Sequence, residues 1–215
     1  MVIAIDGPGG VGKSTVARAV ADMLSLPYLD TGATYRAATL AVLRAGIGSH
    51  DEEAILEVID GVGYEDRTIL LDGADVSVDV RSPDVTATVS EVSAHPRVRH
   101  QIVDLQRRWV DLHGGSAVVE GRDIGTVVFP DATVKVFLTA RSESRAARRA
   151  GDAEAAGASI QAIADALRTR DEADASRATS PMRPADDAHI IDTSEATIAD
   201  VIDAVVALVP RPTAN

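Results

Sequence analysis

A short segment near the N-terminus places glycines, a lysine and a serine at a spacing that suits phosphate binding. Residues 7–14 read Gly-Pro-Gly-Gly-Val-Gly-Lys-Ser and match the pattern G-x-x-x-x-G-K-[ST] at every fixed position. Glycines let backbone N–H groups turn toward a phosphate without a Cβ in the way, and a helix beginning at the loop adds partial positive charge. The pattern predicts that ATP phosphates are bound by Gly7, Pro8, Gly9, Gly10, Val11, Gly12, Lys13, Ser14 and Thr15.

Within this loop two side chains have distinct chemistry. The Lys13 ammonium can reach the β- and γ-phosphates, and the Ser14 hydroxyl can ligate Mg²⁺. Such a loop alone fits a kinase, a switch or a motor. The single asparagine, Asn215, is the last residue of the sequence, so the N-K-x-D motif of guanine-specific GTPases is absent and a standard GTPase is not expected.

Arginine supplies nearly all the positive charge of the sequence. Only Lys13 and Lys135 are lysines among the 21 basic residues. Arg170, Asp174 and Arg177 are spaced i, i+4 and i+7, which places them on one face of a helix. That spacing also suits a solvated face of ion pairs. Phosphoryl transfer between two nucleotides crowds phosphates together, however, and two unit charges about 5 Å apart repel by about 3 kcal/mol at an effective dielectric of about 20. Guanidinium groups offset such repulsion well because they are planar and permanently charged.

Composition excludes several other classes of function. The net charge is −12, from 21 basic and 33 acidic residues, so we expect no binding of nucleic acid or of anionic membranes. Cysteine is absent, which rules out disulfides, thiol nucleophiles and cysteine-based metal sites. The longest apolar run, residues 204–209, is far shorter than a membrane span. No signal peptide is evident, and we expect a cytoplasmic protein.

The elements that would position these residues alternate along the chain. The apolar run at residues 2–6 is typical of a buried strand, and further short strands are predicted at residues 28–30, 117–120, 133–138 and 188–192, with segments of helical spacing between them. This alternation predicts an α/β fold with a five-stranded parallel sheet, helices on both faces and ligands at the carboxyl ends of the strands. Thr31 is expected to cap the helix after the second strand. The last helix is expected over residues 194–209, followed by a loose tail.

One segment interrupts the alternation. Asp72-Gly73 lies between extended stretches, which is typical of a hairpin turn and predicts a small β-rich insertion at about residues 62–80. A length of 215 residues favours one domain carrying an insertion over two equal domains.

Several segments together resemble bacterial cytidylate (CMP) kinases, which are P-loop nucleoside monophosphate kinases. They are residues 5–8 before the loop, Asp-Thr-Gly-Ala-Thr-Tyr-Arg at 30–36, Pro-Arg-Val-Arg at 96–99, Gly-Arg-Asp-Ile-Gly-Thr-Val-Val-Phe-Pro at 121–130, and R-D-x-x-D-x-x-R at 170–177. The resemblance runs from residue 2 to about residue 209. The segment at 121–130 is its most specific part.

The resemblance implies transfer of a phosphoryl group from ATP to CMP or dCMP with Mg²⁺, by a monomer with one domain over residues 1–215. Residues 62–90 would form the region that binds the monophosphate, and residues 140–180 a helical lid. The acceptor nucleotide would be bound by Thr31, Arg36, Ser90, Arg99, Arg122, Asp123, Arg170, Asp174 and Arg177, with Ser90, Arg99 and Asp123 around the cytosine. The residues acting in catalysis would be Lys13, Arg122, Arg170 and Arg177.

Two positions depart from the family pattern. Thr31 replaces a common serine and keeps the hydroxyl, whereas Glu120 replaces a common aspartate and leaves its role toward Mg²⁺ open. Two other functions also fit the residues: a P-loop kinase acting on UMP, AMP or a metabolite hydroxyl, and a P-loop module that binds nucleotide without catalysis.

Overall fold

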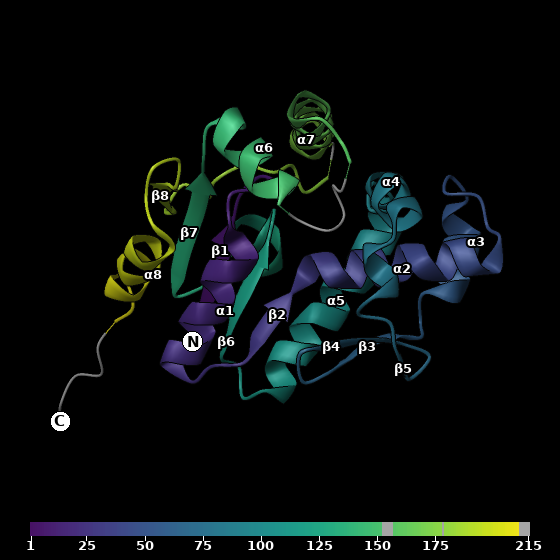
Figure 1. Cartoon of the computed structure of the whole chain (residues 1–215). Coiled ribbons are helices and arrows are strands. Elements are labelled where there is room, and N and C mark those ends of the chain that lie inside the picture. The colour runs from purple at the N-terminus through teal and green to yellow at the C-terminus, as the bar shows by residue number, and fades with distance from the viewer. Residues whose placement is uncertain (152–156, 178, 211–215) are drawn as a thin grey trace.

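The centre of the protein is a parallel sheet of five strands in the order β2-β6-β1-β7-β8 (Figure 1). The computed structural model describes residues 1–151, 157–177 and 179–210. The strands are β1 (Val2–Asp6), β2 (Tyr28–Asp30), β6 (Ala117–Gly121), β7 (Val134–Thr139) and β8 (His189–Asp192), and every pairing between them is parallel. The predicted fold class is therefore confirmed.

Helices cover both faces of this sheet because its central strands β6, β1 and β7 are buried on both sides, whereas the edge strand β8 is largely exposed. Ile3 and Ile5 of β1 pack with residues of α1 (Lys13–Leu24) and α8 (Ile198–Ala207). Ala4, which points the other way, packs instead with residues of α5 (Pro96–Leu112). The alternation of side chains along a strand thus divides the core into two layers.

A second group of elements lies beside the sheet (Figure 1). It contains α2 (Thr31–Ala45), α3 (Glu52–Val58), the short 3₁₀ helix η1 (Asp79–Arg81) and α4 (Pro83–Val92). An antiparallel three-stranded sheet, β3 (Val62–Glu65), β4 (Thr68–Leu71) and β5 (Ala74–Asp75), completes the group. The expected hairpin turn is present, with left-handed φ angles at Asp72 (51°) and Gly73 (76°).

Helices α6 (Ser142–Ala150) and α7 (Ile160–Ala175) lie above the carboxyl ends of the central strands (Figure 1). They form most of the segment expected to be a lid. Residues 152–156 and 178 of that segment, and residues 211–215 of the expected tail, lie outside the described residues. Nowhere in the described ranges is a helix both long and apolar enough to cross a bilayer.

Two local predictions need correction. Asp30, not Thr31, caps α2, since its carboxylate accepts the Ala33 N–H at 3.0 Å. The last helix begins at Ile198 rather than at residue 194, because a reciprocal capping box of Thr197 and Asp200 starts it there, and it ends at Ala207.

Candidate active site

The phosphate-binding loop joins β1 to α1, as its motif requires. Gly7 has a φ of 144°, and a Cβ at this position would lie 2.3 Å from the carbonyl oxygen of Leu138. Gly12 stands at the start of α1 with a left-handed φ of 94°. These positions require glycine for different reasons, one for a close backbone approach and the other for its conformation. The loop opens at the N-terminus of α1, where backbone N–H groups can bind an anion.

Lys13 is folded over this loop. Its ammonium donates a hydrogen bond to the Pro8 carbonyl at 2.8 Å. Burial, together with the nearby charge of Arg122, lowers the pKa of Lys13 to about 8. A phosphate bound in the loop would place negative charge beside the ammonium. That charge would raise the pKa of Lys13 and so oppose the lowering caused by burial and by Arg122.

Ser14 and Glu120 bring hard oxygen atoms together beside the loop. The Ser14 hydroxyl donates to Oε2 of Glu120 at 3.0 Å, and Tyr28 donates to Oε1 of the same carboxylate. Glu120 is only 3% exposed, and burial, with Asp30 nearby, raises its pKa. A hydroxyl and a carboxylate are ligand types that Mg²⁺ accepts, directly or through its waters, so these residues fit that ion.

The segment after β6 is held by a carboxylate at the end of β1. Asp6 accepts the backbone N–H groups of Ile124 and Gly125, both at 2.8 Å. Burial raises the pKa of Asp6 to about 7. These bonds fix the π-helical turn η2 (Ile124–Val128) directly after Arg122 and Asp123. The sequence prediction gave Asp6 no role, although an aspartate that ends a buried strand is a usable signal.

Arg99 and Asp123 form a buried ion pair. The guanidinium of Arg99 lies 2.5 Å from the carboxylate of Asp123, and their side chains are 5% and 6% exposed. Arg99 also donates to the carbonyl of Ser93, and Arg177 donates to the Ser93 hydroxyl at 2.8 Å. Ser93, one turn beyond Ser90, was missed by the sequence prediction. The carbonyl of the half-buried Ser90 accepts the Ser93 hydroxyl at 3.2 Å.

The C-terminal part of α7 meets the segment after β6. Arg170 and Asp174 lie on this helix as predicted, but α7 ends at Ala175, so Arg177 lies beyond it and not on the predicted helical face. Arg122 pairs with Asp171 at 2.8 Å and with Asp174 at 3.1 Å, while Arg177 pairs with Asp174 at 2.5 Å. Asp174 is 2% exposed. Burial and the charge of Arg122 lower the pKa of Arg170 to about 10, and its Nε has no hydrogen-bond partner. Arg170 is thus a cation next to another cation, an arrangement that a phosphate would stabilise.

Asp171 links this helix to the phosphate-binding loop. Its carboxylate accepts the Gly9 N–H at 3.2 Å and hydrogen bonds from Arg122 and Arg145. Burial raises the pKa of a carboxyl group, but the hydrogen bonds from Arg145 and Arg122 outweigh it and hold the pKa of Asp171 below its usual value. The sequence prediction assigned no role to Asp171 or Arg145. Asp171 directly follows Arg170 in the R-D-x-x-D-x-x-R segment, and Arg145 lies between Arg141 and Arg148 at helical spacing; these were the available signals.

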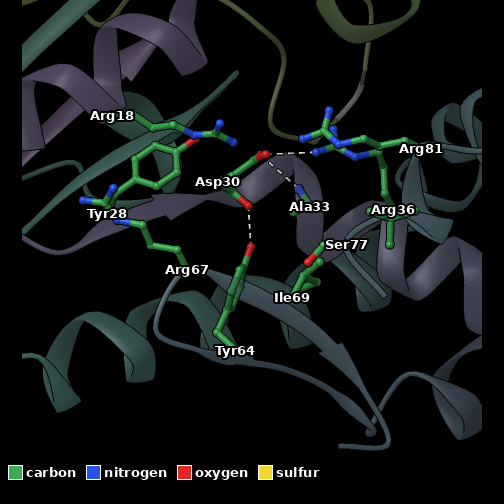
Figure 2. Close-up of a pocket in the computed structure, with 11 residues that line it drawn as sticks. Arg18, Tyr28, Asp30, Ala33, Arg36, Tyr64, Arg67, Ile69, Ser77 and Arg81 are labelled. Atoms are coloured by element: carbon green, nitrogen blue, oxygen red, sulfur yellow. Dashed lines mark hydrogen bonds and ion pairs between the residues drawn. The ribbon is translucent and has the colours of Figure 1, made fainter. Parts of the chain in front are cut away.

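Thr31 and Arg36 lie at the end of β2 and the start of α2. The Thr31 hydroxyl donates to the Glu120 carbonyl at 2.6 Å, and Arg36 pairs with Asp30 at 2.9 Å. Arg36 and Asp30 also line a cavity of about 120 Å³ between β2 and the three-stranded sheet (Figure 2). Arg36 is close enough to Arg170 to lower the pKa of Arg170, as Arg122 also does. These three arginines are therefore near one another.

Comparison with known sequences decides the family. A sequence model of the cytidylate kinase family matches residues 3–211. The chain belongs to this family. A cytidylate kinase of Streptomyces avermitilis is 49% identical over 97% of this chain and 92% of its own length. A cytidylate kinase of Corynebacterium glutamicum is also 49% identical, over 97% of this chain and 94% of its own.

Solved structures that are similar to the chain agree on its fold. A sugar kinase from Janibacter sp. superposes with a TM-score of 0.51 at 14% identity, over 96% of this chain and 92% of that one. An uncharacterized protein from Eubacterium ventriosum gives a TM-score of 0.52 at 13% identity, over 96% of both chains. The cytidylate kinases of Streptomyces avermitilis and Corynebacterium glutamicum, by contrast, share about half of their residues with this protein.

Proposed function

We propose that the protein transfers the γ-phosphoryl group of ATP to CMP or dCMP, giving ADP and CDP or dCDP. One observation carries this proposal: Arg122 and Asp123 are consecutive, yet Arg122 pairs with the Asp171 that binds the phosphate loop, while Asp123 pairs with the buried Arg99. The phosphate-binding loop and a buried polar pair are therefore joined by two consecutive residues. The cytidylate kinases of Streptomyces avermitilis and Corynebacterium glutamicum support the choice of substrate.

On the donor side the loop from Gly7 to Thr15 would hold ATP. Lys13 would leave the Pro8 carbonyl and neutralise charge on the β- and γ-phosphates. Ser14 and Glu120 would hold Mg²⁺, which when bound neutralises part of the charge on the phosphates.

On the acceptor side the Arg99–Asp123 pair would read the edge of cytosine. A guanidinium has donors only and suits O2 and N3, while Asp123 or the Ser90 hydroxyl can accept from the amino group at C4. Arg36 and Thr31 would bind near the acceptor phosphate, and Asp174 beside Arg177 would bind the ribose. The acceptor phosphate is mostly a dianion at pH 7, because its second pKa is about 6, so it needs no general base.

Catalysis in this site would rest on position and charge. Arg122, Arg170 and Arg177 would stabilise the phosphoryl group during transfer. In support, Arg122 and Arg177 both pair with Asp174, and Arg122 is close enough to Arg170 to lower its pKa. Residues 140–180 would act as a lid that excludes water and prevents hydrolysis of ATP. Residues 62–90 would belong to the region that binds the monophosphate. We further propose that the enzyme acts as a monomer in the cytoplasm.

A coupled assay of ADP release across nucleoside monophosphates tests this function. CMP and dCMP should be the best acceptors, with Mg²⁺ required. Preference for UMP, AMP or a metabolite hydroxyl would assign a different P-loop kinase. ATP binding without transfer to any acceptor would assign a nucleotide-binding module instead. Light scattering of the purified protein tests the monomer.

A further inference from the structure

Tyr28 of β2 makes a contact that recognition of the two nucleotides does not explain. Its hydroxyl donates a hydrogen bond to Oε1 of Glu120 on the neighbouring strand β6. In the register of these strands Tyr28 lies opposite Val118 and Asp30 lies opposite Glu120. Tyr28 and Glu120 are thus two positions apart along the strands, which places their side chains on the same face of the sheet.

The Glu120 carboxylate is held at both of its oxygen atoms. Tyr28 donates to Oε1, while the Ser14 hydroxyl donates to Oε2 at 3.0 Å. The three residues form a chain of hydrogen bonds from β2 through β6 to the first turn of α1. Glutamate has one more rotatable bond than aspartate, so its carboxylate needs more support to stay in one place. The Tyr28 hydroxyl supplies that support from the side opposite Ser14.

The ring of Tyr28 is itself held in a fixed position. It is 4% exposed, and the guanidinium groups of Arg18 and Arg67 lie 5.3 Å and 5.9 Å from its centroid. Arg67 is in turn paired with Asp22 at 2.5 Å. Figure 2 shows Tyr28 between these two arginines at one end of the cavity. Cation–π contacts of this kind orient the ring, and the ring directs the hydroxyl.

We propose that Tyr28 is a positioning residue for the magnesium–nucleotide complex. It acts through Glu120, whose carboxylate it fixes beside the Ser14 hydroxyl. This inference rests on the proposed function only in assigning Mg²⁺ to Ser14 and Glu120. Residues that orient the ligands of a metal commonly change metal affinity or activity by about 10- to 100-fold when they are removed. Mg²⁺ keeps several of its own waters, so we expect an effect at the lower end of that range.

The test compares binding of ADP in excess Mg²⁺ with binding of ADP in EDTA, both by calorimetry. The ratio of the two dissociation constants gives the contribution of Mg²⁺ without any turnover. Tyr28→Phe keeps the ring and its cation–π contacts with Arg18 and Arg67 but lacks the hydroxyl and its hydrogen bonds with Glu120 and Arg18. We expect this ratio to fall about tenfold in the variant, with binding in EDTA unchanged. In turnover assays the Mg²⁺ concentration at half-maximal rate should rise, while kcat is regained at high Mg²⁺.

Tyr64→Phe is the matched control. Tyr64 is also a tyrosine lining the cavity, but its hydroxyl donates to the backbone carbonyl of Asp30 (Figure 2). Its removal should leave the Mg²⁺ contribution unchanged. An equal loss in both variants would indicate general loosening of the cavity and overturn the proposal, as would an unchanged ratio in Tyr28→Phe.

Two further outcomes are informative. If Tyr28→Phe does not fold by circular dichroism, Glu120→Gln takes its place, and an unchanged Mg²⁺ contribution in that variant overturns the proposal. If the parent protein binds ADP with Mg²⁺ but does not phosphorylate CMP, the proposed acceptor is wrong. The ratio of dissociation constants still decides the role of Tyr28 in that case.

Discussion

Replacing Arg99 with methionine should change both stability and the choice of base. The side chain of Arg99 is 5% exposed and pairs with a carboxylate, that of Asp123, which is 6% exposed. Removing one partner of such a buried pair leaves an uncompensated charge and costs about 3–5 kcal/mol. Against a typical total stability of about 5–15 kcal/mol, Arg99→Met should remain folded but melt at a distinctly lower temperature.

The effect on specificity follows from the donors that are lost. A guanidinium suits the acceptors O2 and N3 of cytosine and faces the N3–H of uracil unfavourably, and each buried group left unpaired costs about 1–3 kcal/mol. The parent should therefore prefer CMP and dCMP to UMP by about tenfold or more in kcat/KM. Arg99→Met should lose most of this preference, while ATP affinity stays nearly the same because the phosphate loop is a separate element.

A double variant separates the two effects. Arg99→Met with Asp123→Leu replaces the pair with apolar side chains, which is often neutral for stability. Its melting temperature should recover toward that of the parent, but its activity on CMP should not. The measurements are thermal unfolding and kcat/KM for CMP, dCMP and UMP in all three proteins. An unchanged ratio of CMP to UMP in folded Arg99→Met would refute the assignment of this pair to the base.

Three other predictions concern separate parts of the site. Lys13→Ala should lower turnover by at least about 100-fold, or about 2.7 kcal/mol of transition-state stabilisation, with an unchanged circular dichroism spectrum, and near-normal turnover would contradict the role of the loop. Because burial raises the pKa of Asp6 from 3.8 to about 7, its contribution to stability should be complete below pH about 4 and lost as the pH rises through 7. Asp6→Asn should remove that component from the pH dependence of the melting temperature, and parallel curves for parent and variant would contradict the shift. Amide hydrogen exchange in α6 and α7 should slow when analogues of ATP and CMP bind together, and equal exchange with and without ligands would count against a lid.

Much of the fold follows from patterns that are local in the sequence. The apolar runs at residues 2–6 and 117–120 became neighbouring parallel strands because a strand buried on both faces needs apolar residues throughout. The turn at Asp72-Gly73 was predictable because few other residues adopt two consecutive left-handed conformations. Helix ends were less predictable. Asp30 and Thr31 are both good capping residues, and the Thr31 hydroxyl is engaged by the Glu120 carbonyl, which only the folded chain brings near.

The sequence indicated which residues are candidates for the site, but not which of them contact one another. The loop motif indicated Lys13, and the segment at 121–130 indicated Arg122 and Asp123. Their partners depend on packing between distant segments. Asp171 meets Gly9 across 162 positions of sequence, and no periodicity within α7 shows which of its carboxylates faces the loop. Asp6 likewise holds backbone N–H groups that lie 118 and 119 residues away.

Under the proposed function, the contacts of Asp171 would make phosphate binding an exchange of one anion for another. This carboxylate accepts hydrogen bonds from the Gly9 N–H and from the guanidinium groups of Arg122 and Arg145. A phosphate that took those donors would displace the carboxylate, so the measured affinity would be a difference between two sets of similar bonds. The carboxylate would return to the same donors as the product left. Tight and specific contacts with phosphate would thereby be compatible with rapid dissociation, which matters because product release limits the rate of many enzymes.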